Sequence, residues 1–67
     1  MKMSLEIVMD NDAFQNDGRW ASETINCLKK VIEQLEQDRQ WGAIHDTNGN
    51  RVGSFDIDYE HDYQGGV

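Results

Sequence analysis

The segment from Trp20 to Asp38 carries the most regular pattern in this chain of 67 residues. Its apolar residues recur at steps of three and four, which places them along one side of an α-helix. They are Ala21, Ile25, Leu28, Ile32 and Leu35, with Cys27 and Val31 widening the stripe. The polar residues are expected to face water: Glu23, Asn26, Lys29, Lys30, Glu33, Gln34, Glu36 and Gln37. Because such a helix has to bury its stripe, the segments on either side must provide a covering surface.

The segment before the helix, Lys2 to Asp10, alternates between apolar and polar residues as a half-buried β-strand does. Its side chains expected to face the helix are Met3, Leu5, Ile7 and Met9, whereas Val8 is expected on the other side. The composition of Asn11 to Gly18 favours a loop, with Asp17 as the N-cap of the helix. Phe14, the large apolar residue of this loop, is expected to fold back over one end of the core.

Two further alternating segments, Trp41 to Asp46 and Arg51 to Glu60, flank the dipeptide Asn48-Gly49. Asn-Gly between two such segments is a strong hairpin signal, because both central residues of a type I′ turn need a positive φ. We therefore expect these segments to be the two strands of an antiparallel hairpin.

The register of this hairpin depends on the length of its loop. A loop of two or four residues pairs Ile44 with Gly53 and Gly42 with Phe55, where the glycine leaves room for the aromatic ring. A three-residue loop with a bulge would shift the pairing, and the sequence leaves this alternative open. In the first register the outer face of the hairpin consists of Trp41, Ala43, His45, Val52, Ser54, Asp56 and Asp58.

Together these elements predict an α+β fold with the order β-α-β-β. The third strand is expected in the middle of a three-stranded antiparallel sheet, and the amphipathic helix packs on one face of that sheet. The other face stays open to water. We expect residues 1–59 to form a single domain and residues 60–67 to form a frayed acidic and glycine-containing tail.

The charge of the chain is strongly negative, since 13 Asp and Glu oppose six Lys and Arg and leave a net charge of −7. Affinity for nucleic acids depends mainly on Lys and Arg, so direct nucleic-acid binding is not expected. Anionic membranes are disfavoured for the same reason, and no apolar run approaches the roughly 18 residues of a membrane span. The N-terminal residues lack the apolar stretch of a signal peptide, which predicts a cytoplasmic protein. The single cysteine, Cys27, is expected to be buried as a small hydrophobe.

The sequence predicts no catalytic, cofactor-binding or metal-binding residues. Asp46, Asn48 and Asn50 are similar to the start of a calcium loop. However, Arg51 and Ile57 stand where such a loop needs a glycine and a bidentate acid. Turn chemistry explains the three residues better. General acid–base catalysis also needs a cleft that separates the pKa values of two groups, and a small flat sheet predicts none. We therefore expect a protein that is not an enzyme.

A binding surface is predicted near the end of the chain, where acidic residues alternate with apolar and aromatic ones. If the third strand continues, these carboxylates line up about 6.6 Å apart. A row of negative charges at regular spacing, without matching cations, resembles a phosphate backbone. The row could then occupy the basic groove of a nucleic-acid-binding host protein, with a neighbouring Trp and His as anchors. The residues expected to contact this partner are Trp41, His45, Asp56, Asp58, Glu60 and Asp62. An ordinary solvated strand face is the open alternative.

Self-association is the second function that the sequence allows. Val8, Trp41 and Val52 on the open face could pack sheet to sheet in a two-fold homodimer, or two first strands could pair edge to edge. The protein would then be an accessory protein that assembles with itself and has no inhibitory role.

Several turn and core residues are similar to those of small phage- and prophage-encoded proteins: Met9 to Phe14, Asn16-Asp17-Gly18 and Asp46 to Gly53. The likeness covers most of residues 3–59, and its motifs indicate a fold and not an activity. The proline that this group often has near the start of the helix is missing here, and the acidic segment and Trp41 lie outside the shared pattern. The resemblance implies a product that acts in the bacterial cytoplasm. It also implies an anti-defence role, such as an anti-CRISPR inhibitor.

Overall fold

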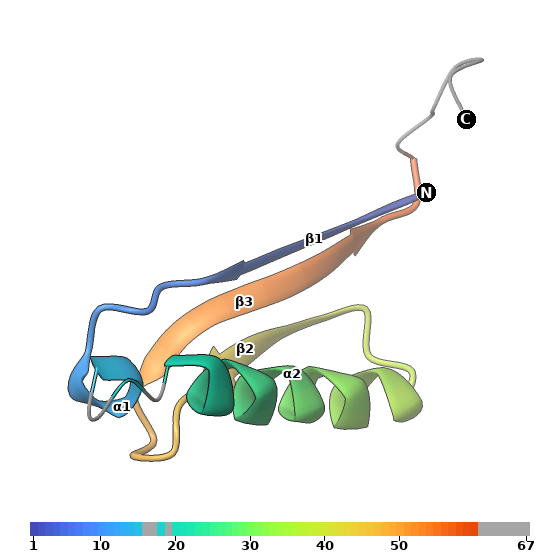
Figure 1. The fold of residues 1–67 in the computed structure, drawn as a ribbon. Helices are drawn as coiled ribbons and strands as arrows, with labels where there is room; N and C mark the ends of the chain where they lie inside the picture. Colours follow the sequence, from blue (N-terminus) through green and yellow to red (C-terminus); the bar gives the residue numbers. More distant parts are fainter. Residues whose placement is uncertain (16–17, 19, 61–67) are drawn as a thin grey trace.

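The computed structural model describes residues 1–15, 18 and 20–60. Its elements are β1 (Lys2–Ile7), α1 (Asp12–Gln15), α2 (Trp20–Glu36), β2 (Trp41–His45) and β3 (Arg51–Asp58). The three strands form one antiparallel sheet in the order β1-β3-β2, with α2 on one side (Figure 1). The predicted α+β fold with the third strand in the middle is therefore confirmed. The predicted strands and the predicted helix end one to three residues too late.

The pairing of the strands gathers apolar side chains on one face of the sheet. Leu5 of β1 lies opposite Phe55 of β3, so both side chains point to the same side. On the other flank of β3, Gly42 lies opposite Phe55 and Ile44 lies opposite Gly53, as predicted. A Cβ atom on Gly42 would clash with Gln34 Oε1 of α2 and come within 2.9 Å of the Phe55 ring, so glycine makes room for both side chains.

The loop of the hairpin is the three-residue alternative, formed by residues 47–49. The backbone N–H of Asp46 donates to the carbonyl of Asn50 at 2.9 Å, and the glycine of the loop has a φ of 85°. One additional residue, Val52, follows before the predicted register resumes at Gly53. This β-bulge turns Val52 into the core. The prediction that Val52 lies on the outer face is wrong for this reason.

The buried core consists of Phe14, Cys27, Val31, Ile44, Val52 and Phe55. Phe14 covers one end of the core as predicted, although it belongs to the short helix α1 and not to a loop. Cys27 is buried as predicted, and burial raises the pKa of its thiol. The proposed N-cap, Asp17, lies outside the described residues.

The helix α2 is rotated about its axis relative to the prediction. Its buried residues include Glu23, which was expected to face water. Of the predicted buried stripe, Ile25 and Ile32 are 53% and 54% exposed, and Leu28 and Leu35 are also partly exposed. The prediction that this stripe faces the sheet is therefore wrong.

Polar contacts explain this rotation. Glu23 accepts two hydrogen bonds from the hairpin loop. Farther along the helix, Gln34 Nε2 donates to the carbonyl of Ala43 at 3.1 Å, and Lys30 Nζ donates to that of His45 at 3.1 Å. These polar side chains hold α2 against β2 and the hairpin loop, which turns the apolar stripe away from β2.

Because α2 is held at this edge, it covers only part of the sheet. Among the described strands, β2 is the one that α2 contacts extensively, whereas β1 and the end of β3 diverge from the helix (Figure 1). Met3 and Leu5 point to the helix side, since they pair with Ile57 and Phe55, yet they remain 42% and 41% exposed. The helix-side face is thus uncovered by α2 at β1 and at the end of β3.

Candidate functional site: the outer face of the sheet

The outer face of the sheet carries a row of three side chains that crosses all three strands. Asp56 of β3 lies between Ser4 of β1 and Trp41 of β2, each of which is its direct partner in the register. Trp41 is 70% exposed, the highest value among the large hydrophobic residues that the structure describes. Side chains directly opposite each other in a sheet lie within contact range, so the indole and the carboxylate form one surface element.

The charge on this face is mixed. Asp58 lies opposite Lys2, and Glu6 lies opposite Ser54. The Lys2 ammonium offsets part of the charge of Asp58, so Asp56 is the carboxylate of β3 that has a neutral partner on both sides. Asp56 therefore has no charged partner in the register, and the acidic residues of the outer face do not form a uniform strip.

The predicted row of four carboxylates requires a third strand that extends to Asp62. However, β3 ends at Asp58. Glu60 lies in a turn, where its backbone N–H donates to Asp58 Oδ1 at 3.0 Å. Asp62 lies outside the described residues. The structure thus brings Asp56 and Asp58 onto one strand face and removes Glu60 from their alternation.

His45 lies on the same side of β2 as Trp41, but four residues farther along the strand. This spacing corresponds to about 13 Å, which prevents the two side chains from forming a single anchor. His45 is exposed and pairs with Arg51 at the hairpin end of the sheet. Its carbonyl oxygen is occupied by Lys30, as described above.

The sequence predicted a turn at Asp46, but not the cluster of hydrogen bonds around its carboxylate. The carboxylate is only 1% exposed. Its Oδ1 accepts the backbone N–H groups of Asn48 at 2.9 Å and Asn50 at 2.8 Å, and its Oδ2 accepts Asn11 Nδ2 at 2.7 Å. Burial opposes the charged form of Asp46, but these hydrogen bonds outweigh burial and lower its pKa. The signal in the sequence was an Asp two residues before Asn-Gly, since Asp accepts hydrogen bonds from the backbone of its own turn.

Glu23 is the second buried carboxylate of the described chain. The hydroxyl of Thr47 donates to it and is the main cause of its lowered pKa. The hydrogen bonds of Glu23 and Asp46 join α2 and Asn11 to the hairpin loop, so we assign both carboxylates a structural role. Over residues 1–15, 18 and 20–60, no group of three His, Cys, Asp or Glu side chains is arranged to hold a metal ion.

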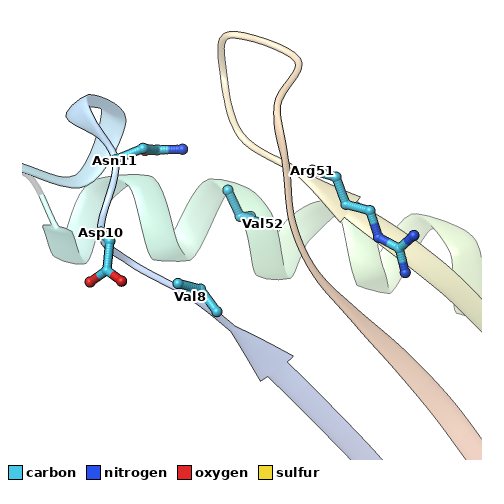
Figure 2. A pocket seen from close by; sticks show the side chains of 5 residues that line it. All are labelled: Val8, Asp10, Asn11, Arg51 and Val52. Carbon is cyan, nitrogen blue, oxygen red and sulfur yellow. The ribbon is translucent and has the colours of Figure 1, made fainter.

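A shallow pocket of about 380 Å³ lies next to the Asp46 cluster (Figure 2). Its lining residues are Val8, Asp10, Asn11, Arg51 and Val52. The guanidinium of Arg51 extends away from the carboxylate of Asp10 (Figure 2). The pocket therefore does not bring this acid and this base together, and we assign no chemistry to it.

The burial of Val52 also changes the predicted sheet-to-sheet dimer. Of its three predicted contact residues, Val8 and Trp41 remain exposed. They stand in different parts of the molecule, since Val8 follows β1 and Trp41 begins β2. The outer face therefore offers two separate apolar side chains and no continuous apolar patch between them.

Neither described helix is long and apolar enough to span a lipid bilayer. Comparisons with protein-family models, with curated proteins and with solved structures find no match to the chain. The likeness to phage-encoded proteins thus stays a prediction, and the outer face has to be interpreted from its own residues.

Proposed function

We propose that this protein is a non-catalytic domain that binds and inhibits a basic, nucleic-acid-binding protein through the outer face of its sheet. One observation carries the proposal: the most exposed large apolar side chain described, Trp41, lies directly opposite the Asp56 carboxylate. An arginine of the partner could pair with this carboxylate and stack on the indole at the same time. Tryptophan is also among the residues enriched in the hot spots of protein interfaces.

The overall charge supports the choice of a basic partner. A net charge of −7 on 67 residues accelerates association with a positive surface, and this effect decreases as salt is added. Because Lys2 lies opposite Asp58, the outer face is a poor copy of a whole phosphate backbone. The proposed contact is therefore a local one at Trp41 and Asp56, helped by long-range attraction.

The resemblance to phage-encoded proteins directs the search for the partner to the defence and nucleic-acid-processing proteins of a bacterial host. An inhibitor that occupies a nucleic-acid site competes with DNA or RNA for that site. Competition with nucleic acid is thus the property that separates this function from non-specific attraction between opposite charges.

The test is capture of proteins from a bacterial lysate by the wild type and by two charge-reversal variants. Asp56→Lys/Asp58→Lys alters the outer face, and Glu33→Lys/Glu36→Lys makes the same change in net charge on α2. We expect the wild type and the α2 variant to retain a nucleic-acid-binding protein that added duplex DNA displaces, and the outer-face variant to lose it. Equal capture by both variants, or capture that DNA does not affect, would contradict the proposal. Circular dichroism checks that all three proteins are folded.

A further inference from the structure

An apolar surface remains exposed on the side of the sheet that faces α2. We call it the helix-side apolar face, and it consists of Ile25, Leu28, Ile32 and Leu35 on α2 and Met3 and Leu5 on β1. It lies on the other side of the sheet from Trp41 and Asp56, because Leu5 shares the face of Phe55. Water-exposed clusters of this kind are typical of protein interfaces and rare elsewhere on small domains.

The helix part and the sheet part of this face meet near the C-terminal end of α2. Near the C-terminal end of α2, Leu35 lines a cleft of about 440 Å³ together with Ile57 and Tyr59 of the β3 end. Near its N-terminal end, the hydroxyl of Thr24 lies 3.8 Å from the sulfur of Met9. At its C-terminal end the apolar stripe of α2 therefore borders the uncovered part of the sheet, and at the N-terminal end the helix contacts the segment that follows β1.

The uncovered part of the sheet has about the width of one helix. It is formed by β1 and the end of β3 at Ile57, since Val52 and Phe55 of β3 belong to the buried core. Two strands span about 9.6 Å at a spacing of about 4.8 Å. An α-helix with its side chains is about 10 Å wide. The 17 residues of α2 make a helix about 26 Å long, and the six residues of β1 extend over about 20 Å.

The stripe itself has the spacing of a helix pair. Ile25, Leu28, Ile32 and Leu35 follow the alternating steps of three and four residues that define the a and d positions of a heptad. Isoleucine occupies both a positions and leucine both d positions, the combination that favours two-stranded association. Each copy of the chain thus has an exposed apolar stripe on α2, to which a second helix can bind, and an uncovered part of the sheet on which that helix can pack.

From these matches we infer that two copies of this chain form a two-fold homodimer through the helix-side apolar face. The α2 helix of each copy lies along the α2 helix of the other copy and over the uncovered part of the other copy's sheet, at β1 and the end of β3. A two-fold interface uses the same patch on both copies. Here each copy contributes the apolar stripe of its α2 and the uncovered part of its sheet. Trp41 and Asp56 remain on the outside of this dimer, so the proposed inhibitor function does not depend on it.

Sedimentation equilibrium from about 1 µM to about 1 mM tests the inference, since this range covers weak and moderate dimers. The wild type is expected to sediment as twice the 7.7 kDa of one chain at the upper concentrations. Ile25→Glu/Ile32→Glu should remain a monomer throughout. Ile25→Ala/Ile32→Ala, which keeps a helix-favouring residue at both positions, should raise the dimer dissociation constant at least about tenfold.

Val8→Glu is the matched control, because Val8 is about as exposed as Ile25 but belongs to another surface. It should dimerise like the wild type, and so should Asp56→Lys/Asp58→Lys. A wild type that is monomeric over the whole concentration range would overturn the inference. The helix-side apolar face would then be a candidate binding site for a different protein. Unchanged dimerisation of the alanine variant would also overturn it. Helical circular dichroism of that variant ensures that a loss of dimer is not a loss of fold.

Discussion

The carboxylate of Glu23 on α2 receives two hydrogen bonds from Thr47 in the hairpin loop, 24 residues later in the chain. The backbone N–H of Thr47 lies 2.8 Å from Oε2, and its hydroxyl lies 2.7 Å from Oε1. Glu23 stands in the first turn of α2, where a negative charge also suits the positive end of the helix dipole. This pair joins the start of the helix to the hairpin and sets which side of α2 faces the sheet.

Replacing Glu23 by Gln is expected to lower the free energy of unfolding by about 1.5–3 kcal/mol, the range for buried hydrogen bonds to a charged group. The amide can present only one oxygen, so one Thr47 donor loses its acceptor. Urea denaturation measures the loss. Glu33→Gln on the exposed side of the same helix is the control and should change stability by less than about 0.5 kcal/mol. Similar effects of the two substitutions would mean that the contact with Thr47 does not stabilise the fold.

Stability is also expected to fall in acid. Hydrogen bonds from Thr47 lower the pKa of Glu23, and those of Asp46 outweigh the effect of burial and lower its pKa as well. The ordinary pKa values of these carboxyls are 4.5 and 3.8, so the unfolded chain takes up protons before the folded chain does as the pH decreases. The stabilisation is therefore complete above about pH 5 and is lost progressively as the pH falls through the folded-state pKa values.

Urea denaturation at about pH 7, 5, 4 and 3 gives this dependence. The free energy of unfolding should be similar at the two higher values and decrease at the two lower ones. The free energy of unfolding of Glu23→Gln should decrease less, because one of the two carboxyls with a lowered pKa is absent. A wild-type stability that does not change between the highest and the lowest pH would contradict the structural role of both carboxylates.

The strands and the hairpin were predictable because they depend on local patterns that no long-range contact overrides. Alternation identified the three strands, and Asn48-Gly49 identified the hairpin. Gly42 opposite Phe55 followed from the need for space around the ring, and the register has this pair. Even so, the position of Val52 depended on whether the loop had three residues and a bulge, which the sequence left open.

The rotation of α2 was not predictable from its periodicity. The period identifies an apolar stripe, but it does not state which surface covers that stripe. Glu23 and Gln34 belong to the polar side of the pattern, and both are drawn to the sheet by partners that are distant in sequence. The apolar stripe of α2 was predicted to be buried against the sheet. Because it is exposed instead, it is the surface through which we propose that the protein dimerises.

The candidate site was predictable in part. Alternation placed Trp41 and Asp56 on the outer face, and the register adds that they are direct neighbours. The sequence pattern did not reveal that Lys2 would lie opposite Asp58, because the partner of each residue depends on the order of the strands. It also overestimated the length of β3 and so included Glu60 in the acidic row.

The end of α2 offers the last prediction. Asp38 has a φ of 62°, the left-handed conformation in which a side chain is strained. Around it, Asp38 N–H donates to Leu35 O at 2.9 Å and Arg39 N–H donates to Gln34 O at 3.1 Å, the pattern of a helix end that usually contains glycine. Asp38→Gly should therefore raise the free energy of unfolding by about 1 kcal/mol, or the melting temperature by about 4–8 °C. Asp38→Ala removes the same charge but keeps a Cβ atom, so it should not be more stable than the wild type. Equal melting temperatures of the glycine and alanine variants would show that backbone strain at this position does not limit stability.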